Sequence, residues 1–139
     1  MSGHMFFADE YYGYDDALYA TGRLARILSN TDKRLSEIMA TVPKYFSTAE
    51  TRIPCPDEKK GEVVARLREY FAQRYEVITV DGARVLFPDG WGLVRASNTS
   101  PKIVARCEGK TREALERICR EMKQAMIGIG GLPDFSWQW

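Results

Sequence analysis

Apolar positions follow the helical period in two long segments of the chain. Residues 57–74 and 111–126 carry apolar side chains every three or four positions, with charged residues between them. The apolar sets are Val63, Val64, Leu67, Tyr70 and Phe71 in the first segment, and Leu115, Ile118, Cys119, Met122 and Met126 in the second. The pattern predicts two helices that each bury one face. Asp57 and Thr111 are the predicted N-caps.

Short β-rich runs flank and separate these helices. The predicted strands are Phe46–Pro54, a weak one, and Tyr75–Val80, Ala83–Phe87, Trp91–Ala96 and Lys102–Glu108. Asp81-Gly82 predicts a two-residue hairpin turn, and Pro88-Asp89-Gly90 predicts a second turn. The order strand, helix, antiparallel strands, helix predicts an α+β domain with a four-stranded sheet and two helices in two layers. The pattern alone also allows a ferredoxin-like topology. The tail after residue 131 is expected to lie over the surface or to fray.

The chain before Pro43 has a different pattern. Met5–Ala8 predicts a short strand, and Asp15 or Asp16 is expected to cap a helix that runs to about Leu28. The apolar positions of that helix span a wide arc, so it needs cover on more than one side. Asp32 is expected to open a second helix, which Pro43 ends. We therefore predict two domains, 1–43 and 44–139, with a hinge at Lys44–Ser47.

Composition limits the classes of function. The 139 residues include 20 basic and 19 acidic side chains, so the formal net charge of +1 creates no long-range field for nucleic acid or an anionic membrane. No apolar run is long enough to span a bilayer. Cys55, Cys107 and Cys119 show no Cys-x-x-Cys spacing, which favours buried free thiols in a reducing cytoplasm. We expect no nucleic-acid partner and no membrane association.

The candidate chemistry lies in the loop after the strand Trp91–Ala96. Arg95 presents a planar fork of donors that matches phosphate oxygens, and Ser97, Asn98 and Thr99 add hydroxyl, amide and backbone N–H groups. Ordinary turn chemistry explains the same residues, because Ser, Asn and Thr side chains bond the local backbone. Residue types alone leave both interpretations open.

Two motifs carry a resemblance to one family. The run Gly-Trp-Gly-Leu-Val-Arg-Ala-Ser-Asn-Thr-x-Pro at 90–101 resembles the phosphate-binding loop in the C-terminal domain of the α-D-phosphohexomutases. With Asn98, the loop resembles that of the phosphomannomutase/phosphoglucomutase branch, because phosphoglucosamine mutases usually carry Gly at this position. Ser2-Gly3-His4, with the residues up to Tyr19, resembles that family's sugar-recognition loop and following helix. The two motifs lie about the family's usual distance apart.

This resemblance implies a fold and a set of site residues. Residues 44–139 would form a TBP-like phosphate-binding domain, and residues 1–43 would be the strand-helix remnant of the preceding α/β sugar-recognition domain. The implied phosphate contacts are Arg95, Ala96, Ser97, Asn98 and Thr99. Ser2, Gly3 and His4 would contact the sugar. Ser100 stands where many relatives have Glu, so no role of that carboxylate is carried over.

The resemblance also implies what the parent enzyme does. The family are isomerases that exchange a phosphoryl group between C1 and C6 of glucose or mannose phosphates. They use a phosphorylated serine, Mg²⁺ and a glucose 1,6-bisphosphate-type activator. This chain has no catalytic serine loop, no Asp-x-Asp-x-Asp metal loop and no Gly-Glu before Ser2. We therefore expect a truncated C-terminal part that binds substrate phosphate, works with the preceding domains of the same enzyme and is inactive alone.

A second hypothesis is a binding module whose sheet serves as a platform for a protein or nucleic-acid partner. Trp91, Phe87 and Tyr75 would then be exposed aromatic side chains available for stacking. The near-zero net charge argues against nucleic acid.

Overall fold

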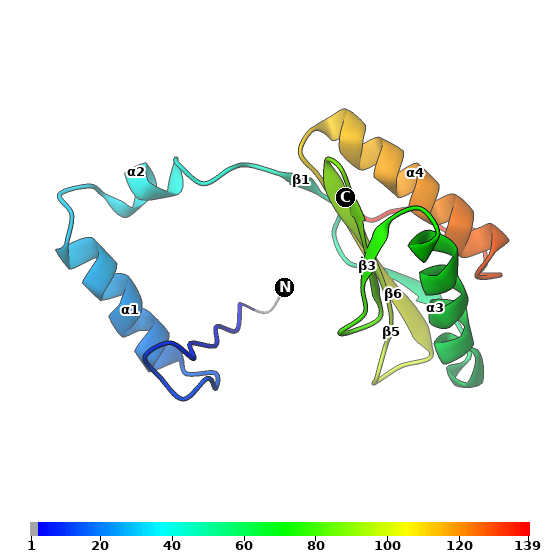
Figure 1. Cartoon of the computed structure of the whole chain (residues 1–139), viewed down its shortest axis with the longest axis horizontal. Helices are drawn as coiled ribbons and strands as arrows, with labels where there is room; N and C mark the ends of the chain where they lie inside the picture. Colours follow the sequence, from blue (N-terminus) through cyan, green and yellow to red (C-terminus); the bar gives the residue numbers. More distant parts are fainter. Residues whose placement is uncertain (1–2) are drawn as a thin grey trace. The chain divides into compact units, whose positions relative to one another are not determined.

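The computed structural model of the chain describes residues 3–139 (Figure 1). It divides into two compact units, which meet in sequence between Pro43 and Lys44. The first contains α1 (Ala17–Ser29) and α2 (Leu35–Met39). The second contains α3 (Asp57–Ala72), α4 (Arg112–Gly128) and one antiparallel sheet. No helix in residues 3–139 is both long and apolar enough to cross a membrane.

The sheet of the second unit has six short strands. They are β1 (Phe46–Ser47), β2 (Thr51–Pro54), β3 (Glu76–Ile78), β4 (Ala83–Phe87), β5 (Gly90–Ala96) and β6 (Lys102–Gly109). Their order across the sheet is β1-β6-β5-β4-β3, and β2 also pairs with β6. Helices α3 and α4 lie on one face of this sheet (Figure 1). The predicted α+β class with two layers is confirmed.

The strand count differs from the predicted four. Segment 46–54 divides into β1 and β2, which pair with different parts of β6, and the predicted strand Tyr75–Val80 is shortened to β3, which pairs with β4 at the edge of the sheet. The division occurs at Thr48, whose Oγ1 accepts a hydrogen bond of 3.1 Å from the Cys107 amide. A side-chain oxygen thus takes the place of a backbone acceptor, which interrupts the ladder. The predicted hinge, Lys44–Ser47, overlaps strand β1 in its last two residues.

The connection between β3 and β4 is wider than predicted. Their last pair is Ile78 with Arg84, so Asp81-Gly82 is not a two-residue hairpin turn. The loop instead packs against β5. Gly82 has a φ of +79°, and a Cβ there would lie 2.3 Å from the Val94 carbonyl oxygen. This close contact brings Asp81 beside β5.

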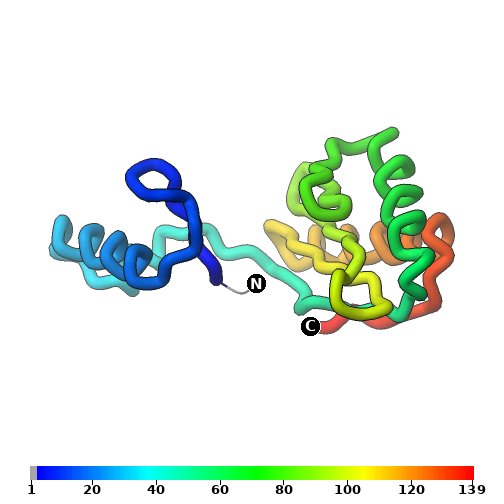
Figure 2. The backbone as a smooth tube through the Cα atoms, turned by 90° about the horizontal axis from the view of Figure 1, so that it is seen from below, coloured from blue at the N-terminus to red at the C-terminus, as the bar shows by residue number. Residues whose placement is uncertain are grey.

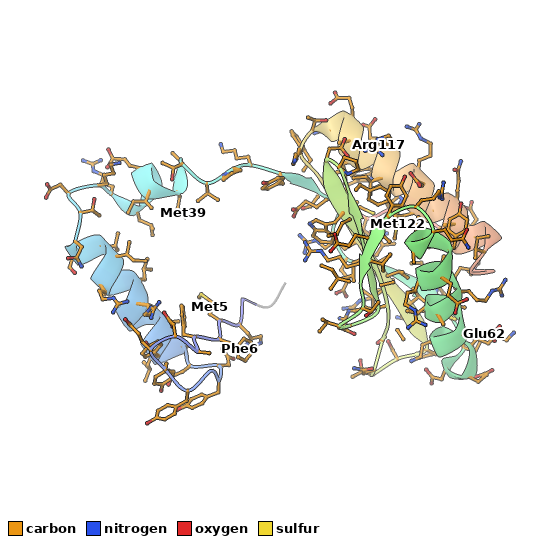
Figure 3. All side chains as sticks on the ribbon, in the orientation of Figure 1. Met5, Phe6, Met39, Glu62, Arg117 and Met122 are labelled. Atoms are coloured by element: carbon orange, nitrogen blue, oxygen red, sulfur yellow. The ribbon has the colours of Figure 1, made fainter. Side chains whose placement is uncertain are left out.

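The predicted apolar faces of both long helices are confirmed. Val63, Leu67 and Phe71 of α3 are buried, as is the predicted α4 set. Figure 3 shows Met122 between α4 and the sheet and Glu62 on the outer side of α3. Thr111 caps α4 as predicted, and its side chain accepts from the Ala114 amide. The N-cap of α3 is Pro56, because Asp57 already has a helical backbone.

The first unit contains two helices, and neither of them has a buried residue. Asp16 caps α1, accepting from the Tyr19 amide at 2.9 Å, and no residue of α1 is buried. The predicted strand at Met5–Ala8 is reduced to one bridge between Phe6 and Asp15, because no other segment within residues 3–43 pairs with it. Arg34, not Asp32, is the N-cap of α2.

The C-terminal tail is attached along the second unit and does not fray (Figure 2). Leu132 is buried, and the Trp137 indole N–H donates to the Cys119 carbonyl oxygen at 3.0 Å. Gln138 accepts from the Ala49 amide at 2.8 Å and donates to Thr51 Oγ1 at 3.0 Å. The tail therefore connects α4 with the segment around β2.

Gly90 provides a test of this packing. A Cβ at Gly90 would lie 2.1 Å from the Glu108 carbonyl oxygen, a backbone atom that cannot move aside. We expect Gly90→Ala to destabilise the second unit by about 2–3 kcal/mol through overpacking. Gly61→Ala is the control, because its Cβ meets nothing within 4 Å and alanine in a helix gains about 0.5–1 kcal/mol.

Tryptophan fluorescence during urea unfolding measures this difference in the second unit alone, because all three Trp residues lie after Lys44. Equal midpoints for the two variants would contradict the close packing of β5 on β6.

Candidate functional site

The loop that closes the β5–β6 hairpin, Ser97–Pro101, is held by its own hydrogen bonds. The Ser97 amide donates to the Lys102 carbonyl oxygen at 3.0 Å, and the Lys102 amide donates to the Ser100 carbonyl oxygen at 2.8 Å. The hydroxyls of Ser97 and Ser100 lie 2.9 Å apart. Strand pairing between Ala96 and Ile103 places both ends of the loop. The backbone here is therefore ordered before any ligand arrives.

Lys60 of α3 also holds this loop, a role that the sequence pattern did not indicate. Its Nζ donates to the carbonyl oxygen of Ser97 and, at 3.0 Å, to that of Ser100. A third contact of 2.6 Å joins Nζ to Asp57 Oδ1. The Lys60 side chain is only 12% exposed, although the helical pattern placed the charged residues of α3 outside. Its position depends on β2 bringing α3 beside the start of β6, which sequence spacing does not reveal.

A cavity of about 450 Å³ lies between the loop and the first turn of α3. It is lined by Asp57, Lys60, Gly61, Ala96, Ser97, Asn98, Thr99, Ser100 and Pro101. The backbone N–H groups of Asn98 and Ser100 donate to no other group within residues 3–139. The Thr99 amide makes only a long contact, 3.4 Å, with Ser97 Oγ. Unpaired N–H groups beside hydroxyls are suited to an anion.

Arg95 is not among the residues that line this cavity. Its Nη1 lies 3.4 Å from Asp81 Oδ2, and the side chain is one-third exposed. The neighbouring Val94 is fully buried, so Arg95 extends from the face of β5 opposite the helices. Exposed ion pairs contribute roughly 0–1 kcal/mol, so the guanidinium is free to exchange Asp81 for another anion.

The predicted sugar-binding residues lie in the first unit. Ser2 is outside the described residues. Gly3 and His4 line a separate cavity of about 670 Å³, together with Asp15 from the start of α1. His4 Nδ1 is hydrogen-bonded to Asp15 Oδ2. The His4 ring is thus oriented by a carboxylate.

The aromatic platform of the second hypothesis is not present. Phe87 is buried, and its ring centroid lies 4.6 Å from that of the half-buried Tyr75. Trp91 donates to Glu108 Oε1 at 3.1 Å, and the Arg84 guanidinium lies 4.4 Å from its ring centroid. The second hypothesis requires all three rings to be exposed. Strand alternation and α3 instead place Phe87 in the core.

Residues 3–139 contain no group of three His, Cys, Asp or Glu side chains that could hold a metal ion. The pair Asp15-Asp16 has roles other than metal binding, because hydrogen bonds from the Tyr19 amide and the Tyr11 hydroxyl lower the pKa of the Asp16 carboxyl.

The three cysteines are free and buried, as predicted. Burial raises the pKa of the Cys55 thiol beside the loop, which lowers its thiolate fraction at neutral pH.

The fold and the loop together define an α+β domain with a candidate anion site at the end of a hairpin. The profile described as phosphoglucomutase/phosphomannomutase, C-terminal domain, matches residues 50–125, and that for alpha/beta/alpha domain III matches residues 1–46. The chain belongs to the phosphoglucomutase/phosphomannomutase family, which consists of isomerases, and it matches the C-terminal domains of that family.

Individual relatives agree with this assignment. The chain is 44% identical to a phosphoglucomutase of Neisseria meningitidis over 99% of its own length and 30% of the relative. It is 41% identical to a phosphomannomutase/phosphoglucomutase of Pseudomonas aeruginosa over 85% of its length and 26% of the relative. A crystal structure of a family protein from Burkholderia thailandensis matches with a TM-score of 0.79 and 36% identity, covering the whole chain and 29% of that protein. The chain thus spans less than a third of these relatives.

The Arg95–Asp81 contact gives a prediction for anion affinity. Asp81→Asn removes the carboxylate that competes for the guanidinium, so we expect inorganic phosphate to bind up to about fivefold more tightly, the range of an exposed ion pair. The dissociation constant follows from a titration monitored by amide chemical shifts of residues 95–100.

Glu76→Gln is the control, because it removes the same charge from an exposed position of β3. If both variants strengthen binding equally, net charge rather than release of Arg95 is responsible.

Proposed function

We propose that this chain is the substrate-phosphate-binding C-terminal region of a phosphomannomutase/phosphoglucomutase that interconverts hexose 1-phosphate and hexose 6-phosphate. The observation that supports the proposal is the loop Ser97–Ser100, in which ordered backbone leaves two N–H groups without a partner within residues 3–139. Arg95, Ala96, Ser97, Asn98 and Thr99 would hold the phosphate that is not reacting. Arg95 would leave Asp81 and supply the bidentate charge.

The loop suits a substrate that must bind in two orientations. The two halves of a 1,6-exchange present opposite ends of the hexose to the reacting centre, so the phosphate grip has to accept either end. A site of backbone N–H groups, hydroxyls and guanidinium recognises phosphate and is indifferent to the sugar carbon that bears it. Binding energy at this remote group helps to orient the reacting end.

We propose that residues 1–43 and 44–139 are two domains, the first being the end of the sugar-recognition domain. Ser2, Gly3 and His4 would donate to or accept from sugar hydroxyls, with Asp15 orienting the His4 ring. The preceding domains of the same enzyme would be the partners of this chain. A cytoplasmic location agrees with the free thiols but remains a prediction.

The chemical step would use groups outside this chain. The family implies a Mg²⁺ ion and a glucose 1,6-bisphosphate-type activator. Residues 3–139 contain no group of three His, Cys, Asp or Glu side chains that could hold the metal ion. The chain alone is proposed to bind hexose phosphate without turning it over.

Arg95→Ala tests the proposal. In the full-length enzyme we expect kcat/KM for glucose 1-phosphate to fall about 100-fold, the effect of losing a hydrogen-bonded charge. Arg66→Ala is the matched control, because Arg66 is an exposed arginine of α3 whose ion-pair partner is Glu62 on the same helix.

The same substitution is measured on this chain by titration with glucose 6-phosphate, with unphosphorylated glucose as the ligand control. An unchanged kcat/KM for the Arg95 variant, or equal shifts with glucose and its phosphate, would rule out the proposed site.

A further inference from the structure

We propose that Lys60 is a positioning residue, which sets the direction of the Asn98 N–H group in the anion site. This inference rests on the proposed function and adds a residue from a second element, α3, to the loop. Lys60 makes three contacts, one to Asp57 and two to loop carbonyl oxygens. An ammonium has three donors, so all of them are used within the protein.

The contact with Ser97 has a direct geometric consequence. A trans peptide is planar, and its C=O and N–H groups point in opposite directions. The Ser97 carbonyl and the Asn98 N–H belong to the same peptide unit. Because Lys60 holds the Ser97 oxygen toward α3, the Asn98 N–H must point away from α3, so the proposed anion contacts the side of the loop that faces away from this helix and not the cavity beside it. That N–H has no partner within residues 3–139 and is available to a ligand.

The contact with Ser100 fixes the other end of the loop. The Ser100 carbonyl belongs to the peptide bond that joins Ser100 to Pro101. Proline has no N–H group, so the contact with Lys60 does not turn any backbone donor away from the ligand. The same carbonyl oxygen also accepts from the Lys102 amide at 2.8 Å. Lys60 therefore holds the loop at both ends and leaves its middle free.

Charge adds to the effect of geometry. A cation bonded to the Ser97 oxygen polarises that peptide and makes the Asn98 N–H a stronger donor. Asp57 partly balances the ammonium charge at 2.6 Å and keeps Nζ at the loop. The Lys60 side chain is 12% exposed, so solvent screens this interaction less than it screens an ordinary surface pair.

The test compares Lys60→Met with Lys59→Met in the complete 139-residue chain. Both variants remove one positive charge from the same helical turn, but Lys59 is exposed and does not line the cavity. Inorganic phosphate and glucose 6-phosphate are titrated while amide chemical shifts are recorded. We expect the dissociation constant to rise about tenfold in Lys60→Met, as for one hydrogen bond to a charged group, and to stay unchanged in Lys59→Met. Lys60→Arg should restore most of the affinity.

A second measurement separates positioning from a general effect of charge. Without any anion, Lys60→Met should change the chemical shift and the hydrogen-exchange rate of the Asn98 amide. A weaker affinity with an unchanged Asn98 amide would overturn the positioning role. If Lys60→Met lowers Tm enough to unfold the chain, Lys60→Gln replaces it, because the amide keeps a donor, and should bind with intermediate affinity.

The Lys60 and Arg95 variants together separate the role of Lys60 from the existence of the phosphate site. If Arg95→Ala loses phosphate binding but Lys60→Met binds like the unaltered chain, the Lys60 role is wrong and the phosphate site stands. If the unaltered chain and Arg95→Ala respond identically to phosphate, the site itself is wrong. A lower Tm with unchanged affinity in Lys60→Met would mean that Lys60 only stabilises the fold.

Discussion

The pairing of β5 with β6 is the constraint on which the second unit depends. Seven residue pairs run from Gly90 opposite Gly109 to Ala96 opposite Ile103. Gly109 lies against the start of α4, where a Cβ would come within 2.5 Å of the Leu115 amide nitrogen. A slip of one residue would turn every side chain of β5 to the other face and put Arg95 in the core. The register of β5 on β6 therefore determines which side chains enter the core and where the loop lies.

Electrostatics around the loop are local and balanced. Lys60 faces Asp57 on the helix side, and Arg95 faces Asp81 on the open side of β5. The whole chain has a formal net charge of only +1, so no long-range field draws an anion to this end of the sheet. Affinity for phosphate at the proposed site would have to come from donors that are already oriented and from cations that can change partner. In the proposed site, Lys60 orients the loop donors through its contacts with the loop carbonyl oxygens, and Arg95 is exposed enough to exchange Asp81 for a ligand.

The two units differ in how much they bury. The second has a continuous core between the sheet and two helices, completed by the tail through Leu132 and Trp137. The first buries no residue of α1 and exposes Leu18 almost fully. A preorganised anion site requires a rigid scaffold around the loop, because its donors must already be oriented when the ligand binds. The match to the C-terminal domain profile covers this better-packed unit.

The sequence by itself determined the α+β class and the two long helices with their buried faces, and it predicted the loop as the place for an anion. These features follow from local periodicity and residue chemistry, which act within a few turns of chain. Tertiary structure alone decided that Lys60 reaches the loop, that Arg95 rests at Asp81 and that Phe87 is buried. It also decided that Met5–Ala8 forms only one bridge, because a strand needs a neighbour that local sequence does not supply. Contacts between distant segments depend on register and strand order, and no short-range pattern encodes them.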